Sequence, residues 1–495
     1  MGKELVKTNK EKKIYIIISG VIIFLSVFLV IFKEWLYNYF GNLTFNEIVF
    51  HIKVPLKGTN KETVLDFFKS STVSIVVITI VLIGINYGFF EKTKKSVISS
   101  LIILFISIMY CINSTDMRSY IINQLKTSSL IENEYVDPNT VKLEFPENKR
   151  NLIYIYLESM ESSHYSEEYG GRMYYNMIPE LLELSKENIS FSINDKYSGG
   201  KVLTGATWTT GAMVAQSAGL PLITDVSDYN NYTGVEFLPG ATFLGDILEE
   251  NGYNQEVMFG SEAEFGGRKD LFKDHGNFKI FDLNTAIERG YMKEEDKVWW
   301  GFSDRDLFKY AKEELSEISK EDKPFNFTML TTDTHFPGGY VCELCDPIVS
   351  NIYHYENVIS CSSRQVYDFV KWIQEQDFYN NTTIILCGDH LTMDQDLEKV
   401  HDFDPTYQRG IVNIIINSVA NIDEPLTKNR IFSTMDLFPT TLSAMGVKIE
   451  GNRLGLGTNL FSNEETLIQK YNETYVNLEF LKRSKFYNKN ILYNK

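Results

Sequence analysis

Three long apolar runs near the N-terminus constrain this chain more than any other feature of its sequence. Uncharged stretches cover residues 14–32 ("IYIIISGVIIFLSVFLVIF"), 72–90 and 96–113, and no comparable run follows. A helix rises about 1.5 Å per residue, so each run is long enough to cross a hydrocarbon core of about 30 Å. The first run is too long for a signal peptide and lacks a small-residue cleavage site. We therefore predict a transmembrane domain of three helices in residues 1–113.

Lysine placement predicts the orientation of these helices. The leader, residues 1–13, holds five lysines, and the turn 91–95 between the second and third runs holds three. Positively charged loops stay on the cytoplasmic side of a membrane. The loop 33–71 and everything after residue 114 should then lie outside the cytoplasm, although this loop also carries several lysines.

From residue 151 onward the residue pattern is typical of a globular domain. We predict a juxtamembrane connector at 114–150, a globular domain at 151–465 and a C-terminal tail at 466–495. Strand-like segments alternate with helical patterns such as "MIPELLELSKENI", which predicts an α/β domain with a mostly parallel sheet covered on both faces. The predicted strands are "NLIYIYLES", "NQEVMF", "FNFTMLTTDTH", "NTTIILCGDH" and "GIVNIIIN". The net charge of −17 and the absence of a basic stripe argue against a nucleic-acid partner.

Polar side chains cluster where the predicted strands end. Glu158 follows the first strand, Asp333 and His335 follow another, and Asp389-His390 follows "TIILCG". In parallel sheets the chemistry lies beyond the carboxyl ends of the strands. One histidine and two carboxylates suit a divalent cation such as Mn²⁺ or Zn²⁺ with an open position for substrate.

Several long segments carry a family resemblance. They are "NLIYIYLESME", "WTTGAMVAQSAGLPL", "TTDTHFPGGY", "VISCSSRQVYDFVKWIQEQDFYNNTTIILCGDHLTM" and "TMDLFPTTLSAMG", within residues 125–462. In this order they resemble the membrane-anchored phosphoglycerol transferases, which include lipoteichoic acid synthase and the periplasmic-glucan enzymes. These proteins belong to the alkaline phosphatase and sulfatase superfamily. The resemblance implies a multi-pass protein of the bacterial cell membrane with an extracytoplasmic sulfatase-like domain.

The resemblance also implies roles for individual residues. Glu158, Asp389 and His390 match the family's metal ligands, for one divalent ion that we expect to be Mn²⁺, with Zn²⁺ or Mg²⁺ as alternatives. Substrate-binding roles fall to three further residues, which are His335, Arg268 and Trp208.

The implied reaction is a two-step phosphoryl transfer. A threonine attacks phosphatidylglycerol, diacylglycerol leaves, and the glycerophosphate held on the threonine passes to an acceptor hydroxyl. The acceptor would be an extracytoplasmic glycan or a teichoic-acid-type polymer. A membrane anchor suits this reaction because the donor is a lipid.

The expected nucleophile is missing at the position to which the resemblance assigns it. In the family a threonine stands about 13 residues before the Gly of a Gly-Leu-Pro or Gly-Ile-Pro turn. Here that glycine is Gly219, so the position is 206, which is Ala206. Three explanations remain open: Thr207 has taken over, the chain is a natural pseudoenzyme, or Ala206 is a deliberate inactivating replacement of threonine. We favour the last of these.

Other functions fit parts of the sequence. A phosphoethanolamine transferase uses the same metal and threonine, and a pseudoenzyme would bind lipid head groups without turnover. A sulfatase needs a Cys or Ser in a C/S-x-P-x-R motif, and no cysteine of this chain heads one.

Three cysteines fall in the part expected outside the cytoplasm, where disulfides persist. We expect Cys361 to pair with Cys342 or Cys345. Free thiols, or a zinc site completed by His354, are the alternatives.

Overall fold

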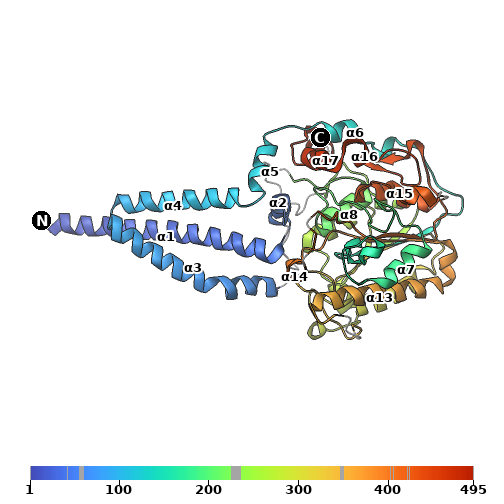
Figure 1. The fold of residues 1–495 in the computed structure, drawn as a ribbon, viewed down its shortest axis with the longest axis horizontal. Helices are drawn as coiled ribbons and strands as arrows, with labels where there is room; N and C mark the ends of the chain where they lie inside the picture. Colours follow the sequence, from blue (N-terminus) through green and yellow to red (C-terminus); the bar gives the residue numbers. More distant parts are fainter. Residues whose placement is uncertain are drawn as a thin grey trace. The chain divides into compact units, whose positions relative to one another are not determined.

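The computed structural model describes residues 2–41, 43–54, 61–224, 236–345, 350–401, 403–404, 406–420, 422 and 424–493. The chain divides into two compact units, each drawn in Figure 1. The membrane unit consists of Met1–Phe45 and Asn60–Ile122, and the globular unit consists of Asn46–Thr59 and Asn123–Lys495.

The membrane unit is built on three long helices. They are α1 (Gly2–Phe40), α3 (Lys61–Phe90) and α4 (Lys94–Asn113), and α1 packs against both of the others. All three are long and apolar enough to cross a membrane. Large apolar side chains point outward along them, with Val73 70% and Phe105 64% exposed, as lipid-facing residues are. The prediction of three transmembrane helices is confirmed.

A short helix lies in the loop between the first two spans. It is α2 (Phe45–Lys53), and from Asn46 onward it belongs to the globular unit. The Asn46 side chain donates to the Leu222 carbonyl at 3.1 Å and accepts from the Thr224 hydroxyl at 3.1 Å. The predicted loop therefore contributes a helix to the surface of the globular unit.

The centre of the globular unit is a six-stranded sheet with the order β4-β3-β5-β2-β6-β7. All neighbouring pairs are parallel except β6 and β7, which are antiparallel. The strands are β2 (Asn151–Leu157), β3 (Asn254–Phe259), β4 (Lys279–Phe281), β5 (Phe325–Leu330), β6 (Thr382–Gly388) and β7 (Asn413–Ile416). The predicted α/β class with a mostly parallel sheet is confirmed.

Helices cover both faces of this sheet, because alternate residues of each strand point to opposite sides. Ile153 and Ile155 of β2 join an apolar core with α7 (Pro179–Glu187), α12 (Asp304–Ile318) and α13 (His354–Gln374). On the other face the Tyr154 hydroxyl donates to the Gln216 side chain of α8 (Thr209–Ala218) at 2.9 Å.

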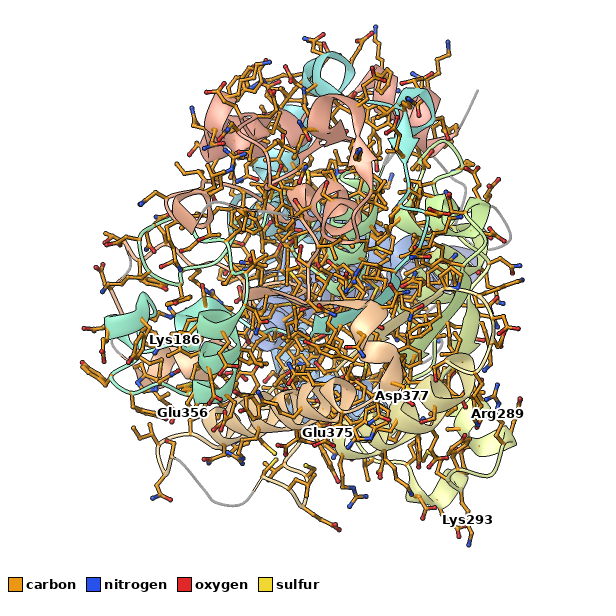
Figure 2. All side chains as sticks on the ribbon, turned by 90° about the vertical axis from the view of Figure 1, so that its right-hand side faces the viewer. Lys186, Arg289, Lys293, Glu356, Glu375 and Asp377 are labelled. Carbon is orange, nitrogen blue, oxygen red and sulfur yellow. The ribbon has the colours of Figure 1, made fainter. Side chains whose placement is uncertain are left out.

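Figure 2 shows α7 and α13 with their charged side chains, among them Lys186 and Glu356. A hydrogen bond at 2.7 Å from Ser363 of α13 to Glu180 of α7 ties the two helices together.

The segments that flank the predicted domain also pack on the globular unit. In the connector, β1 (Leu143–Glu144) pairs with β8 (Lys448–Ile449). In the predicted tail, the buried Tyr487 donates to the Pro221 carbonyl at 2.8 Å. The remaining helices and short strands are α5 (Met117–Gln124), α6 (Leu130–Glu134), α9 (Leu244–Glu250), α10 (Arg268–Asp274), α11 (Leu283–Glu288), α14 (Gln395–Val400), α15 (Leu437–Ala444), α16 (Leu467–Tyr471), α17 (Glu473–Phe480), β9 (Arg453–Leu454) and β10 (Gly457–Thr458).

Candidate functional site

The register of the sheet brings two acidic residues together. β2 and β6 run parallel with Leu157 opposite Gly388, so the next residues, Glu158 and Asp389, lie side by side at the carboxyl edge. Backbone contacts fix this corner, because the Asp389 N–H donates to the Leu157 carbonyl at 3.1 Å. The Ser159 N–H in turn donates to Asp389 Oδ1 at 2.8 Å. Both carboxylates are buried.

His390 completes a set of metal-ligand atoms. Its Nε2 lies 3.6 Å from Glu158 Oε1 and 3.4 Å from Asp389 Oδ2. Tetrahedral ligands at about 2.1 Å from a cation lie about 3.4 Å from one another. The Nδ1 of His390 donates to the Leu391 carbonyl at 2.9 Å, which orients the ring with Nε2 directed into the cluster. The three residues predicted as ligands therefore fit one divalent cation.

The charges of this cluster also suit a cation. Burial and the Glu158 charge raise the pKa of Asp389 to about 7. Burial lowers the pKa of His390, but the Asp389 and Glu158 carboxylates outweigh it and raise that pKa to about 9. Asp389 Oδ2 is buried and has no hydrogen-bond partner within the described residues. A bound cation would neutralise this concentration of negative charge.

Besides the Ser159 hydroxyl, which donates to Glu158 Oε1 at 2.8 Å, a second hydroxyl reaches this cluster, that of Thr209. Its Oγ1 lies 3.4 Å from Glu158 Oε2 and 3.4 Å from His390 Nε2. Thr209 is the first residue of α8, after an extended Trp208 whose side chain does not cap the helix. A threonine at this position extends its hydroxyl from the helix start toward the sheet edge.

Ala206, the residue at the expected nucleophile position, does not lie at the start of α8. It is fully buried in a turn that ends before α8, with its N–H donating to the Leu203 carbonyl at 2.9 Å. The hydroxyl of Thr207, the alternative nucleophile, is buried without a hydrogen-bond partner in the described part of the chain. The structure therefore brings Thr209 to the ligand set in place of Ala206 or Thr207, because α8 begins ten residues before Gly219.

Arg268 is held rigidly at the start of α10. It is 4% exposed, its Nε donates to the Phe265 carbonyl at 2.9 Å, and one Nη donates to Ser261 Oγ at 3.0 Å. The guanidinium also lies over the Phe259 ring, 4.8 Å from its centroid. Burial lowers its pKa to about 10, partly offset by the Glu158 charge, so it stays cationic at neutral pH.

His335 lies in the loop after β5 and packs against the Trp300 ring, with the centroids 4.8 Å apart. Its Nδ1 donates to the Phe336 carbonyl at 2.7 Å. Burial lowers its pKa to about 4, so the ring is neutral at pH 7 and its Nε2 is a hydrogen-bond acceptor.

The helix α2 contributes residues to the surroundings of the site that the sequence pattern did not single out. The ring of its Phe50 lies 5.6 Å from that of Trp208, the predicted substrate-binding tryptophan, whose indole N–H is buried without a partner among the described residues. His51 stacks on Phe265 with the ring centroids 6.2 Å apart, and burial lowers the pKa of His51 to about 4. The loop between the spans thus helps to line the candidate site.

A buried ion pair holds the loop that follows Glu158. Glu161 is fully buried, accepts from Arg409 Nε at 2.9 Å, and accepts from the Thr392 N–H at 2.7 Å. Burial raises the pKa of Glu161, but the Arg409 charge and hydrogen bonds outweigh it and hold the pKa at about 2. This loop and the one after His390 are therefore fastened to each other.

We expect Glu161→Gln to destabilise the globular unit by about 3–5 kcal/mol at pH 7, because Arg409 keeps a buried charge without a carboxylate. The pKa of Glu161 in the folded state lies below its unfolded value of about 4.3, so the contribution is complete above that pH. It is lost as the pH falls from about 4.3 to about 2. Denaturant unfolding of the wild-type chain and of Glu161→Gln, repeated from pH 7 down to about pH 2, measures the difference in the free energy of unfolding. The control Glu317→Gln, in an exposed pair with Lys320, should change stability by less than about 1 kcal/mol.

Comparison with known proteins places this site in a family. The family model described as Sulfatase matches residues 150–447. Phosphoglycerol transferase I of Xanthomonas campestris pv. campestris is 28% identical over 328 residues, covering 64% of this chain and 43% of that protein. Phosphoglycerol transferase I of Escherichia coli is 27% identical over 344 residues, covering 68% of this chain and 41% of that protein. The chain thus spans less than half the length of these relatives.

Two solved structures share the fold. A protein of the alkaline phosphatase superfamily from Vibrio parahaemolyticus has a TM-score of 0.51 and 21% identity, covering 70% of this chain and 79% of that one. The lipooligosaccharide phosphoethanolamine transferase A of Neisseria meningitidis, an integral membrane protein, has a TM-score of 0.50 and 14% identity, covering 86% and 84%. Because the family model matches more than half of the chain and includes both strand ends of the site, this membrane-anchored chain belongs to the sulfatase family.

Proposed function

We propose that this protein transfers glycerol phosphate from phosphatidylglycerol to an extracytoplasmic glycan or teichoic-acid-type acceptor, with Thr209 as the nucleophile. The observation that carries the proposal is the Thr209 hydroxyl, 3.4 Å from both Glu158 and His390. The names of the two transferase relatives support the transferred group. The lysine-rich leader and the turn 91–95 support an extracytoplasmic globular unit.

One divalent cation would be held by Glu158, Asp389, His390 and the Thr209 hydroxyl. Mn²⁺ is our first choice, and Zn²⁺ or Mg²⁺ could use the same oxygen and nitrogen donors. When bound, such a cation lowers the pKa of a coordinated hydroxyl and offsets charge on a phosphoryl oxygen.

The protein groups then carry out two displacements at phosphorus. Thr209 Oγ1 loses its proton and forms a bond to phosphorus, and the bond from phosphorus to the diacylglycerol oxygen breaks. The leaving oxygen takes up a proton, and a glycerophosphate ester remains on Thr209. An acceptor hydroxyl attacks this ester, which transfers the glycerophosphate and restores the threonine. The first amides of α8 have no side-chain cap and can stabilise the phosphoryl oxygens.

Arg268 and His335 would divide the recognition of the head group. The fixed, cationic guanidinium suits a phosphoryl oxygen. His335 is neutral with Nδ1 committed to the Phe336 carbonyl, so its Nε2 can accept from a glycerol hydroxyl or an incoming acceptor hydroxyl.

We expect Arg268→Lys to lower kcat/KM for the lipid donor by about 10²-fold, because a lysine cannot reproduce the planar fork or its stacking on Phe259. The measurement is diacylglycerol release from phosphatidylglycerol vesicles. The control Lys269→Ala changes the neighbouring cation, which is 48% exposed and pairs with Glu264, and should leave kcat/KM within about twofold. Equal loss in both variants would mean that general surface charge, and not Arg268, recognises the donor.

The experiment that tests the function compares two lipid donors. The purified chain in vesicles of phosphatidylglycerol or phosphatidylethanolamine should release diacylglycerol from the first and little from the second. The reverse preference would establish a phosphoethanolamine transferase, the alternative suggested by the fold of the Neisseria meningitidis enzyme. Head-group binding without release from either lipid would establish a pseudoenzyme.

A further inference from the structure

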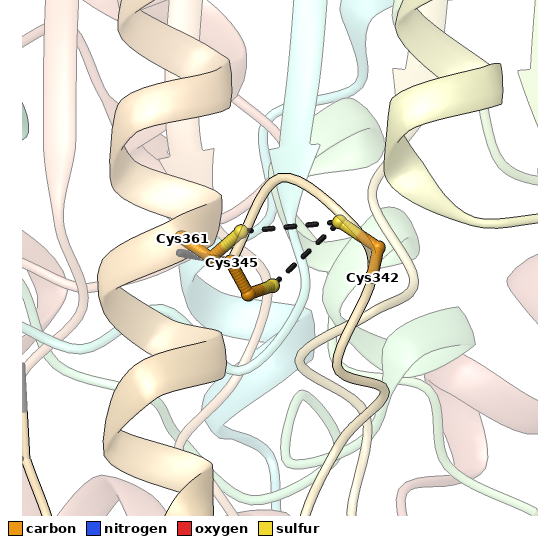
Figure 3. A group of neighbouring side chains, drawn as sticks. All are labelled: Cys342, Cys345 and Cys361. Carbon is orange, nitrogen blue, oxygen red and sulfur yellow. Dashed lines mark hydrogen bonds between the residues drawn. The ribbon is translucent and has the colours of Figure 1, made fainter. Parts of the chain in front are cut away.

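Three cysteine side chains converge on one another, as Figure 3 shows, and they form a group separate from that of Glu158, Asp389 and His390. Cys342 and Cys345 lie in the loop between β5 and α13, and Cys361 lies within α13. Cys342 Sγ is 3.6 Å from Cys345 Sγ and 3.9 Å from Cys361 Sγ, and all three sulfurs lie within 4.8 Å of one another. Each side chain is at most 7% exposed.

These distances match a metal site better than a disulfide. All five cysteines of the chain are free, so the expected pairing of Cys361 is not formed. A disulfide holds its two sulfurs about 2.05 Å apart, and it would leave the third cysteine as a buried thiol with no covalent partner. Tetrahedral thiolates at about 2.3 Å from Zn²⁺ lie about 3.8 Å apart, close to the separations of Cys342 Sγ from the other two sulfurs. His354 is not among the residues of this cluster.

A neighbouring amide supports a cation at this point. The Gln365 amide, one helical turn after Cys361, lies 3.4 Å from Cys361 Sγ and 3.7 Å from Cys342 Sγ. An amide N–H donated to thiolates is the kind of outer contact that orients metal ligands.

We propose that Cys342, Cys345 and Cys361 bind a second metal ion, a thiophilic divalent cation of which Zn²⁺ is the best match. Soft thiolate ligands select such ions, whereas the carboxylates and histidine of the first cluster suit harder ones. The fourth position is filled by a solvent oxygen or by the Gln365 amide oxygen after rotation of the amide.

The site would fasten a long loop to the helix that follows it. The connection runs from Leu330, the last residue of β5, to His354, the first of α13, and it carries His335. Loops of this length need internal ties, because ordering them costs conformational entropy at every residue. A metal that joins Cys342 and Cys345 to α13 therefore fixes the segment that places His335 at the phosphoryl-transfer site.

The test measures metal and thiols in the full chain, purified in detergent without reductant. Zinc content should fall by about one equivalent in Cys361→Ser and stay unchanged in Cys111→Ala, which removes a buried thiol of α4 outside the cluster. In denaturant with a chelator, all five cysteines should react with a thiol reagent. After exchange with Co²⁺, a thiolate-to-cobalt absorption band should appear in Asp389→Asn and vanish in Cys361→Ser, since only the cysteine cluster offers sulfur ligands.

Unchanged zinc in Cys361→Ser, or only three of the five thiols reactive in the wild-type chain, would overturn the proposal. The second result would establish a disulfide within the cluster. If Cys361→Ser does not accumulate, the thiol count of the wild-type chain and the cobalt spectrum of Asp389→Asn still decide between a metal site and a disulfide. None of these readouts depends on the lipid donor or on transferase activity, so the proposed function can fail while this site stands.

Discussion

Thr209→Ala is expected to lower diacylglycerol release from phosphatidylglycerol vesicles by about 10⁴-fold or more. The variant keeps Glu158, Asp389 and His390 but removes the oxygen that would attack phosphorus, and the groups left behind have nothing to activate. In the wild-type chain, rapid quenching during turnover should trap a glycerophosphate adduct on Thr209, detected by mass spectrometry of the peptide. The adduct should be absent from the variant, and the fold should remain because Thr209 is partly exposed.

Neighbouring positions provide the controls. Thr207→Val keeps the volume of the side chain and removes a hydroxyl that makes no hydrogen bond within the described residues, so activity should stay within a fewfold of wild type. Ala206→Thr should bring no gain, because position 206 is fully buried in the turn before α8. An active Thr209→Ala with an inactive Thr207→Val would make Thr207 the nucleophile. A rise of several orders of magnitude in Ala206→Thr would return the nucleophile to that position.

The meeting of the candidate metal ligands could be predicted from the sequence because it depends on one regular element. The segments of β2 and β6, "NLIYIYL" and "TTIILCG", are rich in the β-branched and aromatic residues of strands, and in a parallel sheet the ends of neighbouring strands meet at one edge. Glu158 and Asp389 are the first residues after those segments, and Leu157 does lie opposite Gly388. No finer detail of packing was needed to bring them together.

The position of Thr209 could not be read from the spacing to Gly219. Counting back from a glycine assumes the length of the helix between, and helix starts are the least regular part of a sequence pattern. The chain offers one signal, the aromatic-threonine pair Trp208-Thr209, at which α8 begins. The start of the helix, more than the glycine at its end, decides which hydroxyl reaches the sheet edge.

The contacts of α2 and of the cysteine cluster depend on packing between distant segments. Phe50 meets Trp208 across more than 150 positions, and nothing in the pattern "FNEIVFHIK" names that partner. Cysteine spacing alone likewise leaves several pairings open, as well as the choice between a disulfide and a metal. The three-dimensional placement of Cys361 beside both loop cysteines is the observation that favours the proposed metal site.

Asp389→Asn should remove about one equivalent of bound divalent cation and lower diacylglycerol release by about 10³-fold or more. The substitution preserves the fold because Asp389 Oδ1 accepts from the Ser159 and His390 N–H groups at 2.8 and 2.7 Å, and an amide oxygen can accept both bonds. The change falls on Oδ2, which lies 3.4 Å from His390 Nε2 within the ligand set. An amide nitrogen there turns a negative ligand into a hydrogen-bond donor, which repels the cation.

Metal content and thermal unfolding together test this prediction. Added Mn²⁺ should raise the Tm of the metal-stripped wild-type chain, since a ligand that binds only the folded state stabilises it by mass action. The Tm of Asp389→Asn should not respond at the same Mn²⁺ concentration. Asp396→Asn is the matched control, because its carboxylate is 62% exposed on α14 and pairs with Lys399, and it should respond as wild type does. If Asp389→Asn retains its metal and its Mn²⁺ response, the cation is held by other residues, and the cluster of Glu158, Asp389 and His390 is a buried hydrogen-bonding network.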